Sequence, residues 1–150
     1  MKVIQFYESD RQDYWLEQIK KSDWGAGQYL YSLVKEGKLK ETVGPRVDLL
    51  LLVDGDQLIS FATYADLDDV QPTELTPWIG FVYTFPEYRG HHYVGKLFDE
   101  AVRIAKKEGV EKIYISTNHI GLYEKYDCEF FQMMKDIEGE DSRIYIKHVK

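Results

Sequence analysis

Residues 78–108 constrain the fold most, because the periodicity of their apolar residues changes across a short turn. Residues 78–85 are rich in β-branched and aromatic side chains and predict a buried strand, which Pro86 ends. Apolar residues then recur at helical spacing, at Leu97, Ala101, Ile104 and Ala105. We therefore predict a strand, a short basic turn and a helix.

The start of this helix is a candidate anion site. A helix that begins directly after a turn directs unpaired backbone N–H groups and the positive end of its dipole into that turn. Phosphate groups bind readily at such helix starts. Arg89, His91 and Lys96 add positive charge or hydrogen-bond donors there. The sequence therefore predicts a phosphate site between the strand and the helix.

The turn PEYRG and the helix after it resemble the acyl-CoA-binding motif of the GNAT superfamily of N-acyltransferases. The family pattern is Arg or Gln, two residues, Gly, one residue, and then Gly or Ala. In the gap-free register Arg89 matches, whereas His92 and Val94 occupy the two small-residue positions. We prefer this register because it keeps the apolar helix residues in the family's core positions. Gly90 and Gly95 then make the turn flexible.

A second motif with the family's spacing follows near the C-terminus. LYEKYDCEF, residues 122–130, resembles the common ending LYEKxGF, with Asp127 and Cys128 in place of Gly and Phe. Two motifs in the expected order make the chain similar to GNAT N-acetyltransferases over residues 1–150. The resemblance implies a single α/β domain with a GNAT-like fold. Its sheet would be twisted, mixed and mostly antiparallel, with six or seven strands flanked by helices.

The resemblance also implies a site for acetyl-CoA as co-substrate. In the family the fourth and fifth strands separate at a bulge, and the pantetheine arm pairs with the exposed strand edge, which assigns Val82, Tyr83 and Thr84 to that arm. The pyrophosphate is assigned mainly to main-chain N–H groups of Arg89, Gly90, His91, His92, Tyr93, Val94 and Gly95. Asn118 corresponds to an asparagine that often holds CoA, and an ordinary helix cap is its alternative role.

Tyr123 matches the tyrosine of the family's LYE motif, which implies a role as general acid. A phenol with a pKa of about 10 can protonate the CoA thiolate as it leaves. Packing in the core is the alternative role for Tyr123, and Tyr126 is the substitute acid. The acid that some members carry on the fourth strand is missing from residues 78–85. The general base therefore stays open between water, Glu74 and His119.

The first half of the chain predicts helices and a hairpin. We expect a strand over residues 2–7, then two consecutive helices within residues 10–37, the first capped by Asp10 and the break near residues 22–27. The buried side of these helices is predicted to hold Trp15, Ile19, Tyr29, Leu30 and Leu33. The aromatic residues Trp15, Trp24, Tyr29 and Tyr31 either pack the helices or form a wall of the acceptor site.

Residues 47–53 and 57–65 predict two antiparallel strands around the turn 54–56. The polar segment 66–77 contains two prolines and predicts a surface loop. Its acids either are solvated or face a cationic substrate; they are Asp66, Asp68, Asp69 and Glu74.

After the central helix, Gly109 is a predicted helix stop, and residues 111–117 predict a strand parallel to residues 78–85. A short helix over residues 119–126 is expected to be capped by Thr117 or Asn118. Asp127 follows in a position that tolerates left-handed backbone. Residues 128–135 and 142–148 then predict an antiparallel pair.

The charge and composition of the chain narrow the classes of partner and the compartment that we expect. The formal net charge of −7 argues against nucleic acid, since phosphate backbones are bound by clustered basic residues, and it favours a cationic partner. The lone Cys128 cannot form an internal disulfide, and residues 1–10 lack the apolar run of a signal peptide. No apolar run approaches the roughly 20 residues that cross a bilayer. We therefore expect a cytoplasmic protein without membrane contact, and a homodimer is left open.

The adjacent side chains His91 and His92 diverge on a turn, and the other histidines are distant in sequence, so we expect no metal. The predicted function is transfer of an acetyl group from acetyl-CoA to a primary amine of a small, cationic acceptor. The alternative is a catalytically silent acyl-CoA-binding or regulatory domain, because two bulky side chains occupy the small-residue positions of the turn.

Overall fold

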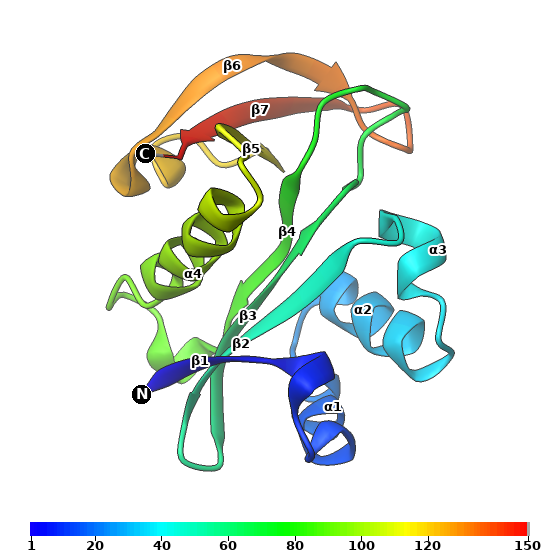
Figure 1. Ribbon diagram of the computed structural model, residues 1–150, viewed down its shortest axis with the longest axis vertical. Helices are drawn as coiled ribbons and strands as arrows, with labels where there is room; N and C mark the ends of the chain where they lie inside the picture. The colour runs from blue at the N-terminus through cyan, green and yellow to red at the C-terminus, as the bar shows by residue number, and fades with distance from the viewer. Residues whose placement is uncertain (150) are drawn as a thin grey trace.

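A computed structural model describes residues 1–149, and over this range seven strands form one twisted sheet in the order β1-β2-β3-β4-β5-β7-β6 (Figure 1). The strands are β1 (Lys2–Gln5), β2 (Val47–Asp54), β3 (Gln57–Ala65), β4 (Trp78–Thr84), β5 (Lys112–Thr117), β6 (Cys128–Lys135) and β7 (Asp141–His148). The α-helices are α1 (Gln12–Lys20), α2 (Gly25–Lys35), α3 (Leu39–Val43) and α4 (Val94–Lys107). The 3-10 helices are η1 (Phe6–Glu8), η2 (Pro86–Tyr88) and η3 (Tyr123–Tyr126).

The predicted mixed, mostly antiparallel sheet is confirmed, since the pair of β4 and β5 is parallel and the other neighbouring strands are antiparallel. Helix α4 covers one face of the sheet, and α1 and α2 lie on the other (Figure 1). This layering explains the continuous apolar run of β2, because a strand covered on both faces must be apolar at successive positions. Leu50 and Leu52 pack toward α4, whereas Leu49 and Leu51 pack toward α1 and α2.

The helical hairpin of the first half agrees with the prediction in its break and in most of its buried side. Trp15 is buried in α1, as are Ile19, Leu30 and Leu33 along the pair. Tyr29 differs, because 49% of its surface is exposed. The predicted N-terminal cap of the first helix, Asp10, was also wrong.

Helix α1 begins one residue later than a cap at Asp10 would require, and no side chain caps it. The Ser9 hydroxyl instead accepts a hydrogen bond from the Arg11 N–H at 3.0 Å, because η1 sets the chain direction before α1 starts. Helix α3 was not predicted. No helix among the described residues is long and apolar enough to cross a membrane.

The second half confirms the predicted order of elements except at one helix. Residues 119–126 do not form a helix throughout, and a single 3-10 turn, η3, is present. Gly121 has a φ of +88°, which interrupts a right-handed helix, so neither Thr117 nor Asn118 caps one. The Thr117 hydroxyl accepts a local hydrogen bond from the His119 N–H at 3.1 Å. Asp127 adopts the predicted left-handed conformation, with a φ of +62°.

Strands β4 and β5 separate after two residue pairs, and this separation positions the site. Trp78 pairs with Tyr114 and Ile79 with Ile115, after which β5 continues beside β7 alone. The register of β4 against β3 shifts between Gly80 and Tyr83, where β4 contains one extra residue. Phe81 lies in this bulge with a φ of +50°. The bulge bends β4 away from β5 and leaves one edge of β4 unpaired.

Candidate active site

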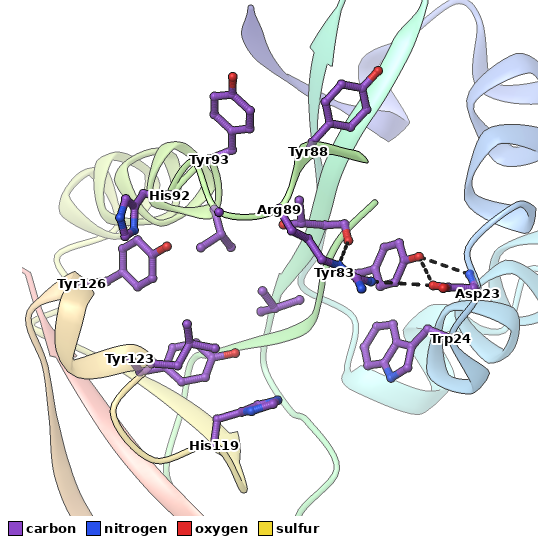
Figure 2. Close-up of a pocket in the computed structure, with 15 residues that line it drawn as sticks. Asp23, Trp24, Tyr83, Tyr88, Arg89, His92, Tyr93, His119, Tyr123 and Tyr126 are labelled. Carbon is purple, nitrogen blue, oxygen red and sulfur yellow. Dashed lines mark hydrogen bonds and ion pairs between the residues drawn. The ribbon is translucent and has the colours of Figure 1, made fainter. Parts of the chain in front are cut away.

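A cavity of about 580 Å³ lies between the open edge of β4, the start of α4 and η3 (Figure 2). It brings together most of the residues predicted to bind CoA, together with the predicted acid; these are Val82, Tyr83, Thr84, Arg89, Gly90, His92, Tyr93, Val94 and Tyr123. His91 and Gly95 do not line it. A Cβ added to Gly95 would lie 3.3 Å from the Tyr126 ring, so this glycine lets α4 approach η3. Asn118 lines a different cavity.

The open edge of β4 presents the backbone of alternate residues. Tyr83 pairs with Phe61 on β3, and the Tyr83 carbonyl also accepts a 2.6 Å hydrogen bond from the Ser60 hydroxyl. Successive residues of a strand direct their backbone groups to opposite edges. Val82 and Thr84 therefore present theirs toward the cavity, whereas Tyr83 contributes its ring.

The turn before α4 has the geometry of an anion site. The N–H groups of His91, His92 and Tyr93 have no hydrogen-bond partner among the described residues. Gly90 has a φ of +88° and His92 a φ of +57°. The His92 position is one where the family has a small residue, and its left-handed backbone explains why glycine suits it. In this protein a histidine holds that left-handed conformation in place of a small residue.

One wall of the cavity is a cluster that the sequence did not indicate. The Tyr83 hydroxyl donates a hydrogen bond to the Asp23 carboxylate, and Trp24 stacks on the Tyr83 ring at 5.6 Å between centroids (Figure 2). The Arg89 guanidinium lies 5.4 Å from the centroid of the same ring, and its Nε donates to the Thr84 carbonyl at 2.9 Å. These contacts fix the loop between α1 and α2 against β4.

A second cavity of about 610 Å³ lies on the other side of the gap between β4 and β5. Four residues line both cavities, namely Trp24, Val82, His119 and Tyr123. The second cavity is acidic, with Asp68, Asp69, Asp136 and Glu138 in its lining. Tyr29, which extends outward from α2, also lines it, so the predicted alternative of an aromatic acceptor wall fits its position.

The segment between β3 and β4 is held in place by the turn between β6 and β7. The Ile137 N–H donates to the Asp69 carbonyl at 2.9 Å, and the Gln71 N–H donates to the Lys135 carbonyl at 3.1 Å.

Two of the predicted acids lie outside the cavity. The Asp66 carboxylate accepts the backbone N–H of Arg46 at 3.1 Å, and Glu74 is exposed.

Tyr123 lies between the two cavities and is buried. Its ring stacks on Phe98 at 5.8 Å between centroids and lies 6.1 Å from that of Tyr145. Burial raises the pKa of the Tyr123 phenol, and the charge of Asp68 raises it further. The phenol therefore keeps its proton at neutral pH. Tyr126, the substitute acid, lines the first cavity and not the second, and burial raises its pKa as well.

Two acids of the second cavity, Asp68 and Asp69, resist ionisation because their pKa values are raised. Burial raises the pKa of the Asp68 carboxyl well above its usual range, and the charge of Asp69 adds to the rise. Burial also raises the pKa of Asp69, while a hydrogen bond from Ser116 opposes that change. A cationic ligand would favour the ionised forms of these two carboxyls, because a nearby positive charge offsets the solvation that burial removes.

A sheet opened at a bulge, with a helix start beside the open edge, offers a free strand edge and free backbone N–H groups to an extended ligand that carries phosphate. The chain matches the Acetyltransferase (GNAT) family over residues 4–128 and therefore belongs to that family. It is accordingly an acetyl-CoA-dependent acetyltransferase. No curated protein matches the sequence.

Solved structures agree with this fold. Aminoglycoside 6'-N-acetyltransferase from Enterococcus faecium has a TM-score of 0.71 at 12% identity, and the match covers 100% of this chain and 98% of that one. An aminoglycoside 6'-N-acetyltransferase in complex with coenzyme A has a TM-score of 0.70 at 13% identity, with the same coverage. An acetyltransferase from Salmonella typhimurium that modifies the N-terminal serine of a 50S ribosomal subunit protein has a TM-score of 0.68 at 10% identity, over 99% and 94% of the two chains.

No group of three or more His, Cys, Asp or Glu side chains in residues 1–149 is arranged to hold a metal ion.

The raised pKa of Asp68 predicts a stability that falls as pH rises. Because the folded-state value lies above the unfolded value of about 4, the native state binds more protons than the unfolded chain between the two values. Stability is therefore lost as pH rises through this window. Asp68→Asn should remove this loss, so its melting temperature should exceed that of the wild type by a margin that grows as pH rises above about 4.

Thermal unfolding followed by circular dichroism across this range measures the difference. Glu74→Gln removes the same charge from an exposed position of the same loop and should follow the wild type. Parallel curves for wild type and Asp68→Asn would contradict the assignment of a buried, destabilising carboxylate.

Proposed function

We propose that the protein transfers an acetyl group from acetyl-CoA to a primary amine of a small, cationic acceptor, and that residues 1–150 form one acetyltransferase domain. The observation that carries this proposal is the junction of two unlike cavities at Tyr123. One cavity has free backbone donors and an open strand edge, and the other has carboxylates. A thioester and an amine would meet where the two join.

The proposed CoA site follows from the first cavity. The backbone of Val82 and the N–H of Thr84 are placed to pair with the pantetheine amides, as an added strand would. The Thr84 carbonyl already accepts Nε of Arg89. The free N–H groups of residues 91–93 at the start of α4 are placed to receive the pyrophosphate. The main chain of His91 in this turn and of Gly95 in the first turn of α4 belongs to the same helix start, although neither residue lines the cavity. Asn118 lies on the acceptor side, away from these contacts.

The proposed chemistry uses Tyr123 as the general acid. When the amine nitrogen attacks the thioester carbonyl, the bond between carbon and sulfur breaks and the thiolate needs a proton. A buried phenol that keeps its proton at neutral pH is suited to this step. Of the two candidate tyrosines, Tyr123 lines both cavities and Tyr126 lines one, which supports the choice of Tyr123.

The acidic lining of the second cavity supports a cationic acceptor. Asp69, Asp136 and Glu138 would attract an amine and hold its further ammonium groups. Two of the structures similar in fold are aminoglycoside acetyltransferases, whereas a third modifies a protein N-terminus. The small-molecule acceptor is therefore proposed from the cavity and not from the fold. A cytoplasmic location and a homodimer stay predictions.

Gly90→Glu tests the CoA site. A carboxylate beside the pyrophosphate should weaken CoA binding several-fold or more, because like charges in contact cost on the order of 1 kcal/mol even when solvated. Gly90→Gln imposes the same side-chain bulk at a φ of +88° without the charge and serves as the control. Calorimetric titration of CoA measures the difference, and equal affinities for the two folded variants would place the pyrophosphate elsewhere.

Tyr123→Phe tests the acid. The substitution keeps the ring packing and removes the proton, so kcat should fall about 10²-fold while the CoA dissociation constant hardly changes. Thiol release measures turnover, and calorimetry measures binding. Tyr126→Phe is the matched comparison on the same 3-10 helix. A loss of turnover confined to Tyr126→Phe would transfer the role to that residue.

The double substitution Asp69→Asn with Glu138→Gln tests the acceptor class. Attraction between exposed charges is screened over about 8 Å at physiological ionic strength, so added salt should raise the acceptor KM of the wild type more than its acetyl-CoA KM. The double variant should have a higher acceptor KM at low salt and a weaker salt dependence. Glu74→Gln is the charge-matched control. An acceptor KM that responds neither to salt nor to the double substitution rules out electrostatic recognition.

A further inference from the structure

Asp68 lies at the point where β4 leaves β5. Ile79 is the last β4 residue paired with β5, and Gly80 is the next residue along the strand. A Cβ added to Gly80 would clash with Oδ1 of Asp68 and lie 2.8 Å from its Cγ. The Asp68 carboxylate therefore occupies the space that a β4 side chain would fill, at the vertex of the gap between the two strands.

The backbone around Asp68 is fixed on both sides. The carbonyl of the next residue, Asp69, accepts a hydrogen bond from Ile137, and Gln71 donates one to Lys135. Thr76 donates a 2.8 Å hydrogen bond to the Asp66 carbonyl at the start of the loop. The backbone that carries the carboxylate is thus held in place before any ligand arrives, which favours the fixed position that a catalytic group requires.

Asp68 is an acid of this cavity whose carboxylate has no ion-pair partner among the described residues. Among residues 1–149 no Lys, Arg or His forms an ion pair with it. Its one nearby donor is the backbone N–H of Asp69. Asp136, by contrast, accepts two backbone N–H groups of its own turn at 2.9 Å each. A proton from a ligand would therefore find the Asp68 oxygens available.

Asp68 and Tyr123 line the same space. Both line the second cavity, and the charge of Asp68 is felt at the Tyr123 phenol. Tyr123 also reaches the first cavity, whereas Asp68 does not line it. An amine in the second cavity would thus lie beside the carboxylate, with the phenol nearer to the sulfur that leaves.

We propose that Asp68, seated on Gly80, is the general base that takes the proton from the acceptor ammonium group; this inference rests on the function proposed above. Strand β4 itself carries no acidic residue. Because Gly80 has no side chain, the preceding loop can place the Asp68 carboxylate there. His119, which lines both cavities from an exposed position, is the competing group.

The protons balance in this scheme. The ammonium group gives one proton to Asp68, and the free amine attacks the thioester carbonyl carbon. A bond between nitrogen and carbon forms and the bond between carbon and sulfur breaks. The thiolate takes the phenol proton of Tyr123. The second proton on nitrogen returns to the Tyr123 phenolate, and Asp68 releases its proton to solvent, which gives the amide, CoA and one free proton. Burial raises the pKa of the Asp68 carboxyl, which makes its carboxylate a stronger base than an ordinary one.

Steady-state thiol release with acetyl-CoA and either kanamycin or spermidine tests the inference. Asp68→Asn should lower kcat about 10²-fold and remove the ascending limb of the pH profile that the carboxyl sets. Gly80→Ala keeps the carboxyl but displaces it, so it should also lower kcat. Because this substitution leaves the net charge unchanged, the loss would show that the position of the carboxyl matters and not its charge alone. Glu74→Gln should retain the wild-type kcat and pH profile, and His119→Gln should retain the ascending limb.

Circular dichroism checks that each variant is folded, and Gly80→Ala carries the test if Asp68→Asn is not. An active wild type whose turnover and pH profile survive in both Asp68→Asn and Gly80→Ala overturns the inference alone. Loss of the limb in His119→Gln, with Asp68→Asn unaffected, assigns the base to His119. A wild type that binds CoA in calorimetry but releases no thiol with either amine overturns the proposed function and this inference with it.

Discussion

The loss of pairing between β4 and β5 after Ile79 is the constraint on which the site depends. It arises from one extra residue in β4, where Phe81 has a φ of +50°, a conformation that a bulky side chain rarely adopts. The strand bends, and one edge stays bonded to β3 while the other is free. A free strand edge inside a protein needs a partner, because unpaired backbone groups are costly away from water. The pantetheine arm of CoA is the partner we propose.

The same separation creates the acidic side of the site, at a cost in stability. The carboxyl of Asp68 lies half-buried against Gly80, with no ion-pair partner among residues 1–149, so its ionised form is disfavoured in the folded chain. Proteins accept such local costs at functional sites when the surrounding structure holds the group in place. Here the backbone hydrogen bonds between the loop before β4 and the turn between β6 and β7 do so.

Elements with a strong periodic signal could be predicted from the sequence. The apolar run of β2 and the helical spacing in α4 reflect burial within a continuous segment, and Tyr123 was placed by a local motif. The helix expected over residues 119–126 failed because Gly121 adopts a left-handed backbone that periodicity does not reveal. Asp136 and Glu138 were missed because they reach the cavity from a turn that only sheet topology brings near Asp68. Asp23 was missed for the same reason, since its partner Tyr83 lies sixty residues away.

Amide hydrogen exchange of β4, followed by NMR with and without saturating CoA, tests the central claim most directly. If the open edge of β4 holds the pantetheine arm, the Val82 and Thr84 amides should exchange more slowly with CoA bound. The Tyr83 amide should change little, because that residue already pairs with β3. This alternation is the expected signature of an added strand. Unchanged exchange at both Val82 and Thr84 in a CoA-saturated sample would contradict the account.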